Sequence, residues 1–261
     1  MSLENLQKQT SPQPWPPAGV KWYYSDKWVA IACGDCREIL PQLDVKVDLV
    51  LTDPPYVGLK GNQKLMNNIG VGKHYNNNPT VGDIWKANIE WMELCLKPLN
   101  YGIIAFCQFH DVHSMALEAN KLGLKAIALG TWHARNSPPS VQNRPHYTTN
   151  FMWYLEKTPG LKWRKLETMY DIPKLATGCM ATERIVDKDG CAIHPTQKPS
   201  ELISKLLQVD AQTILDPFLG SGTTCYCAKK LNRYSIGIEI EEKYCEIAAK
   251  RCSQEVMELK I

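Results

Sequence analysis

Short apolar runs alternate along this chain with longer segments in which apolar residues recur every three or four positions. The run at residues 47–52 is apolar and stops at two prolines, which is typical of a strand buried in a parallel sheet. Spacings of three and four residues are typical of amphipathic helices. The pattern predicts strands at 47–52, 101–106, 125–131, 151–155, 213–215 and 235–238, and helices at 84–96, 112–122, 201–209, 223–231 and 241–256.

Strands that alternate with helices of this length predict an α/β fold built on a mostly parallel, twisted sheet. Ligands of such sheets bind at the carboxyl ends of the strands. Asp53, Asp216 and Glu239 each stand at the carboxyl end of a predicted strand. We therefore expect these three carboxylates to belong to one site.

Three segments lack a regular pattern. Residues 1–24 are polar and hold four prolines, which predicts an extended N-terminal arm before a single domain at 25–261. Residues 57–80 are rich in glycine and asparagine and directly follow Tyr56, so we expect a flexible loop over the site. Residues 157–192 form a second weakly patterned segment.

Composition narrows the class of protein. Hydrophobic content of 44% and charged content of 22% are ordinary for a globular chain. No apolar run approaches the roughly 20 residues that span a bilayer, and the first ten residues do not look like a secretory signal. The ten cysteines are then expected to be reduced thiols. Cys33 and Cys36 form a CxxC without a matching second pair, so buried thiols are favoured over a metal site.

Positive charge is small in total but unevenly placed. The net charge is +3, and basic residues gather at 57–80 and 133–165. Ordinary solvated loops would also show such clusters, whereas a phosphate-facing surface would require them. The candidate DNA contacts are Lys60, Lys64, Lys73, Arg135, Arg144, Lys162, Arg164 and Lys165.

The segment Asp216 to Thr224 predicts a cofactor site. Its glycines permit a tight turn, and the helix that follows offers free N–H groups to an anion such as a carboxylate. Asp216 can hold an ammonium group, and Glu239, 23 residues later, can hold the hydroxyls of a ribose. An amine, a carboxylate and a ribose together describe S-adenosyl-L-methionine. The segment lacks the lysine of a phosphate-binding loop.

The segment Asp53-Pro54-Pro55-Tyr56 predicts the chemistry. An amino group on a base is a poor nucleophile, and acceptors for its two N–H groups make its lone pair available. The Asp53 carboxylate and the Pro54 carbonyl can each accept one hydrogen bond, and the prolines fix the direction of that carbonyl. Tyr56 offers a ring for stacking, which implies a base flipped out of the duplex. In isolation, the same four residues could also form a simple turn after a strand.

These segments resemble those of the amino-methylating DNA methyltransferases, in the group whose catalytic motif precedes the cofactor motif. Further matches are Gly34-Asp35 and His194 to Pro199. The resemblance implies a circularly permuted, Rossmann-like methyltransferase fold, with target recognition at about 157–192. It also implies S-adenosyl-L-methionine as cofactor, with contacts from Asp35, Asp53, Lys198, Asp216, Phe218, Gly220, Ser221, Gly222, Thr223 and Glu239.

The expected reaction is methylation of the 6-amino group of adenine in double-stranded DNA, because family members that modify cytosine more often carry serine at the position of Asp53. The 4-amino group of cytosine is the alternative. A glutamine-modifying methyltransferase would carry asparagine there and the opposite motif order, and a silent DNA-binding module would not need an intact tetrapeptide. The sequence leaves open a homodimer and a partner restriction endonuclease. The expected setting is the cytoplasm of a bacterial or phage-infected cell.

Overall fold

The structure is a computed structural model that describes residues 14–55, 90–134, 149–173, 185 and 197–254. Within these residues, nine strands form one sheet in the order β1-β2-β9-β8-β3-β4-β6-β5-β7. The strands are β1 Tyr24–Ser25, β2 Val29–Cys33, β3 Val47–Thr52, β4 Leu99–Cys107, β5 Lys125–His133, β6 Thr149–Glu156, β7 Met169–Asp171, β8 Thr213–Asp216 and β9 Tyr234–Glu239.

The centre of the sheet is parallel. Strands β2, β9, β8, β3 and β4 run in one direction, while β6 is antiparallel to both β4 and β5. Strand β2, the second in chain order, lies beside β9, the last strand among the described residues. The α/β sheet is permuted and parallel at its centre, as the sequence predicted, and antiparallel pairs at β1-β2, β4-β6 and β6-β5 make it mixed.

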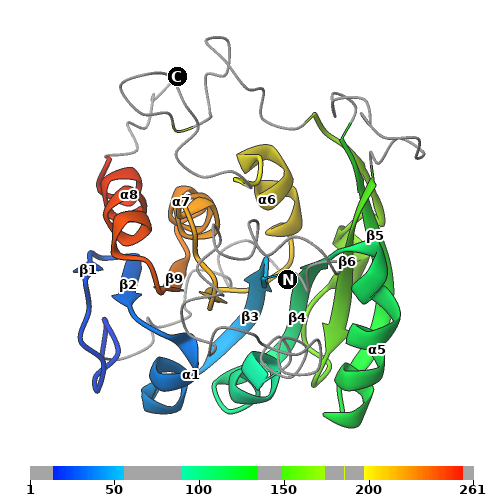
Figure 1. Cartoon of the computed structure of the whole chain (residues 1–261), viewed down its shortest axis with the longest axis horizontal. Helices are drawn as coiled ribbons and strands as arrows, with labels where there is room; N and C mark the ends of the chain where they lie inside the picture. The colour runs from blue at the N-terminus through cyan, green and yellow to red at the C-terminus, as the bar shows by residue number, and fades with distance from the viewer. Residues whose placement is uncertain (1–13, 56–89, 135–148, 174–184, 186–196, 255–261) are drawn as a thin grey trace, which may run out of the picture.

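Helices cover both faces of the sheet. Helices α6, α7 and α8 lie on one face, and α1 and α5 lie on the other (Figure 1). The helices are α1 Cys36–Ile39, α5 Val112–Lys121, α6 Ser200–Leu206, α7 Thr223–Lys230 and α8 Glu242–Ser253, with short 3-10 turns at Leu40–Gln42, Phe109–Asp111 and Trp163–Lys165. Residues 90–95 are helical, and the earlier part of the helix predicted at 84–96 lies outside the described residues.

Two-sided cover explains why the middle positions of the central strands are apolar on both faces. Val50 and Ile103 pack with Trp91 on one face, whereas Leu49 and Ile104 pack with Leu202 on the other. Consecutive strand residues thus enter two different cores, and a continuous apolar run is what such a strand requires.

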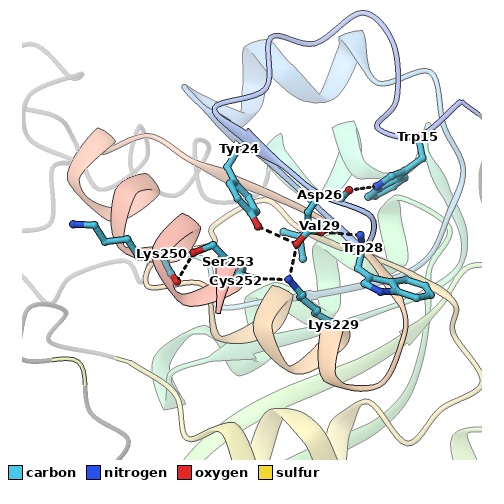
Figure 2. Close-up of polar contacts among 9 residues, drawn as sticks. All are labelled: Trp15, Tyr24, Asp26, Trp28, Val29, Lys229, Lys250, Cys252 and Ser253. Carbon is cyan, nitrogen blue, oxygen red and sulfur yellow. Dashed lines mark hydrogen bonds and ion pairs between the residues drawn. The ribbon is translucent and has the colours of Figure 1, made fainter. Parts of the chain in front are cut away.

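The segment before β2 packs against the domain. The Trp15 ring lies 4.9 Å from the Tyr234 ring, and Trp15 Nε1 donates to the Asp26 carbonyl at 3.0 Å. The Asp26 carboxylate accepts from Lys229 Nζ at 2.6 Å, and the same ammonium donates to the Cys252 carbonyl at 2.5 Å (Figure 2). These bonds tie residues 15–26 to α7 and to the end of α8. The rest of the arm predicted at 1–24, residues 1–13, lies outside the described residues.

Candidate active site

Four neighbouring strands end side by side at the carboxyl edge of the sheet. Asp35 follows β2 by one intervening glycine, Glu239 ends β9, Asp216 ends β8 and Asp53 follows β3. Since β2, β9, β8 and β3 are adjacent and parallel, the four carboxylates line one edge. The structure thus brings together the acids at the strand ends.

Asp216 is the most buried of these acids, at 4% exposed. Its Oδ1 accepts from Thr52 Oγ1 at 2.8 Å and from the Phe218 N–H at 3.1 Å. Burial raises the pKa of the Asp216 carboxyl to about 6, although bonds from Thr224, Thr52 and Phe218 oppose the shift. Ionisation of this buried carboxyl costs free energy, and a cation that binds beside it would offset that cost. Asp216 is therefore suited to bind a positively charged group.

The turn after Asp216 depends on two glycines. Gly220 and Gly222 have φ of 54° and 82°, in the left-handed region that disfavours side chains. A Cβ on Gly222 would lie 2.8 Å from the Ala248 Cβ, so α8 packs directly on the turn. Ser221 and Thr223 are buried beside them. The turn therefore presents backbone N–H groups at the start of α7 in a fixed position.

Glu239 supports this turn from the next strand. Its Oε2 accepts from the Gly220 N–H at 2.8 Å, and its Oε1 accepts from the Glu241 N–H at 2.9 Å. Burial raises the pKa of this carboxyl, while the backbone bonds hold it down. A carboxylate has about four acceptor positions, so both oxygens can still receive hydroxyls.

Asp35 begins α1 and holds an arginine. It accepts from the Arg37 N–H at 2.9 Å and pairs with the Arg37 guanidinium at 2.5 Å. The Gly34 N–H donates to the Glu239 carbonyl at 2.8 Å, which places Asp35 next to Glu239. The two acids thus stand at neighbouring positions on the edge.

Asp53 contacts Lys198 rather than solvent alone. Their side chains form an ion pair and are 21% and 11% exposed. The Lys198 Nζ also lies 4.9 Å from the centre of the Phe106 ring, within the range of a cation–π contact. Pro54 is buried and Pro55 is half-buried, while Tyr56 lies outside the described residues.

The structure does not bring all the predicted DNA contacts to this edge. Lys162 and Lys165 both pair with Asp210, the former at 2.7 Å, and Asp210 lies just before β8 begins. Arg164 belongs to the same 3-10 turn. These three residues therefore lie at the amino edge, about 20 Å from Asp53 by the length of β3. Lys60, Lys64, Lys73, Arg135 and Arg144 lie outside the described residues.

Three further residues help to build the site. Thr52 fixes Asp216, Phe106 lies under Lys198, and Arg251 donates to Thr223 Oγ1 at 2.8 Å and to Ser200 Oγ at 2.9 Å. Thr52 could have been noticed as a polar residue that ends an apolar run. The roles of Phe106 and Arg251 left no signal in the sequence, because they depend on contacts between distant segments.

Comparison with known proteins shows which family the chain belongs to. The N6_N4_Mtase model, described as DNA methylase, matches residues 47–250, which contain Asp53, Asp216 and Glu239. The protein belongs to this DNA methylase family. Its residues are 26% identical to Type II methyltransferase M2.DpnII of Streptococcus pneumoniae, over 90% of this chain and 93% of that protein. Type II methyltransferase M2.LlaDCHI of Lactococcus lactis subsp. cremoris gives the same figures.

Solved structures share the fold. The M1.HpyAVI–SAM complex aligns with a TM-score of 0.63 and 24% identity over 87% of this chain and 100% of that one. The PvuII cytosine-N4-specific DNA methyltransferase aligns with a TM-score of 0.71 and 17% identity over 92% and 91%. At these identities the likeness shows the methyltransferase fold.

The family transfers a methyl group from S-adenosyl-L-methionine to an amino group of DNA. The residues at the carboxyl edge fit this cofactor. Asp216 is a buried acceptor for an ammonium, the first turn of α7, which no side chain caps, offers N–H groups to a carboxylate, and Glu239 has acceptor positions for ribose hydroxyls. No helix among the described residues has both the length and the apolar character to cross a membrane.

Proposed function

We propose that this family member methylates the 6-amino group of an adenine that is flipped out of double-stranded DNA. The observation that carries the proposal is the position of Asp53. It follows the last residue of β3 and lies at the same edge of the sheet as Asp216, which ends the neighbouring strand β8. A base whose amino group bonds Asp53 would stand directly beside the cofactor turn. The expected setting is a bacterial cell in which DNA is accessible to the enzyme.

Asp53 and Pro54 act on the nucleophile. The carboxylate and the carbonyl each accept a hydrogen bond from one of the two N–H groups. The nitrogen lone pair is then less delocalised into the ring and is available to attack the methyl group of the cofactor. Alignment of the two reactants supplies much of the acceleration, and the Asp53 charge stabilises the positive charge that develops on the nitrogen. S-adenosyl-L-methionine, held by Asp216, Glu239 and the first turn of α7, would supply a methyl group on a sulfonium leaving group, and the methylated nitrogen would give up one proton to water.

The same geometry accommodates the 4-amino group of cytosine, which also carries two N–H groups. Aspartate at position 53 favours adenine, since the resemblance associates cytosine-modifying members with serine there.

The test is to incubate the purified protein with isotope-labelled S-adenosyl-L-methionine and bacterial DNA, and to digest the DNA to nucleosides for mass spectrometry. We expect label in N6-methyladenine. Label confined to N4-methylcytosine would replace adenine with the alternative, and unlabelled DNA would refute both. Sequencing with modified-base detection then gives the recognition site. Residues Lys60, Lys64, Lys73, Arg135 and Arg144 remain predicted phosphate contacts.

Asp53→Ala is the matched test of mechanism. It should bind S-adenosyl-L-methionine within about threefold of wild type, by titration calorimetry, but lose methyl transfer by a factor of about 100 or more, as expected for loss of a transition-state contact. Retention of full activity in this variant would contradict the role of Asp53.

A further inference from the structure

Lys198 joins the catalytic carboxylate to the cofactor helix. Its ammonium pairs with Asp53 and lies over the Phe106 ring. Its backbone carbonyl, at the other end of the residue, accepts from Thr223 Oγ1 at 3.4 Å in the first turn of α7. The backbone is thus fixed at the start of the cofactor helix, and only the flexible side chain reaches Asp53.

The ion pair occupies one oxygen of the carboxylate that the target amine needs. Lys198 Nζ donates to Asp53 Oδ2, and Asp53 is the proposed acceptor for the target amino group. The ammonium adds the attraction of opposite charges to its hydrogen bond, which a neutral amine does not. The target amine alone therefore competes poorly with Lys198 for Oδ2.

Binding of the cofactor changes the competition. The expected place of its carboxylate is the start of α7, where the backbone of Lys198 is attached through Thr223. That carboxylate would enter an edge that already holds the carboxylates of Asp53, Asp216 and Glu239, where the Arg251 guanidinium donates to Thr223 and Ser200, so a further cation would strengthen its binding. Rotation about the side-chain bonds of Lys198 can supply one without moving the backbone.

We propose that Lys198 is a positioning residue whose ammonium passes from Asp53 to the cofactor's carboxylate, so that cofactor binding makes Asp53 available to the target amine. This inference rests on the proposed function. It predicts that cofactor and DNA each strengthen binding of the other by the same factor, because the coupling of two ligands is reciprocal.

Fluorescence anisotropy of a labelled duplex carrying the site found by sequencing tests this coupling. S-adenosylhomocysteine, which keeps the amino-acid tail but has no methyl to transfer, should tighten DNA binding by wild type about tenfold. Methylthioadenosine, which lacks the tail, should leave it unchanged. In Lys198→Met the effect of S-adenosylhomocysteine should fall below about twofold, because no ammonium remains to be moved.

Lys205→Met is the matched control. Lys205 lies on α6 and pairs at 3.4 Å with Glu201 on the solvent side, with half of its side chain exposed. This variant should keep the tenfold coupling, and Lys198→Arg, which keeps the charge, should recover most of it. Recovery in Lys198→Arg would show that the positive charge carries the coupling, and an unchanged urea midpoint for Lys198→Met would exclude misfolding as the cause of its loss.

Two results would overturn the proposal on different grounds. A wild type that methylates DNA, together with a Lys198→Met variant that keeps the full coupling, refutes the role of Lys198 and leaves the proposed function intact. A wild type that transfers no methyl group to DNA refutes the proposed function and this inference with it.

Discussion

Replacement of Asp216 by asparagine should stabilise the protein near neutral pH and weaken cofactor binding at the same time. Asparagine has nearly the same shape and keeps an oxygen for Thr52 and the Phe218 N–H, which both donate to Oδ1. What it removes is the charge of a side chain that is 4% exposed. The variant therefore isolates the cost of ionising a buried carboxyl.

The size of that cost follows from the pKa. Burial raises the pKa of the Asp216 carboxyl from 3.8 to about 6. Two pKa units correspond to about 3 kcal/mol of free energy. The unfolded carboxyl ionises first as pH rises, so the folded state binds more protons between pH 4 and 6, and stability falls across that window. Above pH 6 to 7 the wild type carries the full cost, whereas the asparagine variant carries none.

Urea unfolding of both proteins from pH 4 to 7 measures this effect. The difference in free energy of unfolding, variant minus wild type, should rise by about 3 kcal/mol over the range. Any fixed effect of the amide cancels from the change. The Asp216→Asn variant should also bind S-adenosylhomocysteine about 10- to 100-fold more weakly, since a charged hydrogen bond to the ammonium is lost.

Asp210→Asn provides a control of opposite sign. Lys162 and Lys165 hold the pKa of the Asp210 carboxyl below its usual value. Its stabilising effect is therefore present above the unfolded pKa and is lost as pH falls through the folded pKa. This variant should be less stable than wild type at pH 7. A flat difference for Asp216→Asn across pH 4 to 7 would show that its buried carboxyl is not perturbed.

Two further substitutions test the cofactor turn. Glu239→Ala should weaken the binding of S-adenosylhomocysteine by about tenfold or more, because the ribose acceptor and the bond to the Gly220 N–H are both lost. The affinity for DNA without cofactor should stay within twofold of wild type. Equal cofactor affinity of variant and wild type in a calorimetric titration would contradict the ribose role. Gly222→Ala should lower the free energy of unfolding by about 1–3 kcal/mol, because its φ of 82° and the 2.8 Å approach to Ala248 leave no space for a methyl group; unchanged urea midpoints would contradict the packing of α8 on the turn.

The sequence predicted the central sheet because each buried strand is a continuous apolar run with a polar residue at its end. Strand β2, with Val29 to Ala32 fully buried, has the same character and was missed although Gly34-Asp35 marked its end. Strand β7 is three residues long, too short to show a period.

Contacts between segments that are distant in the sequence could not be predicted from the spacing of apolar and polar residues. Nothing in the sequence shows that Lys198 meets Asp53, 145 positions away. In the same way, Lys162 and Lys165 looked like phosphate contacts because their neighbours are basic. Their partner, Asp210, is 45 positions beyond Lys165 and joins them only when the amino edge of the sheet assembles.

The pairing of β2 with β9 sets an order of events during synthesis. Val29 lies opposite Ser235. More than 200 further residues must therefore be synthesised after β2 before β9 is available to pair with it. Until then β1 is the partner available to it, through the antiparallel pair of Tyr24 with Ile31. Asp35 consequently joins Glu239 only after β9 has been translated. In truncated chains that stop before β9, the edge of β2 that normally pairs with β9 would be unpaired and prone to aggregation.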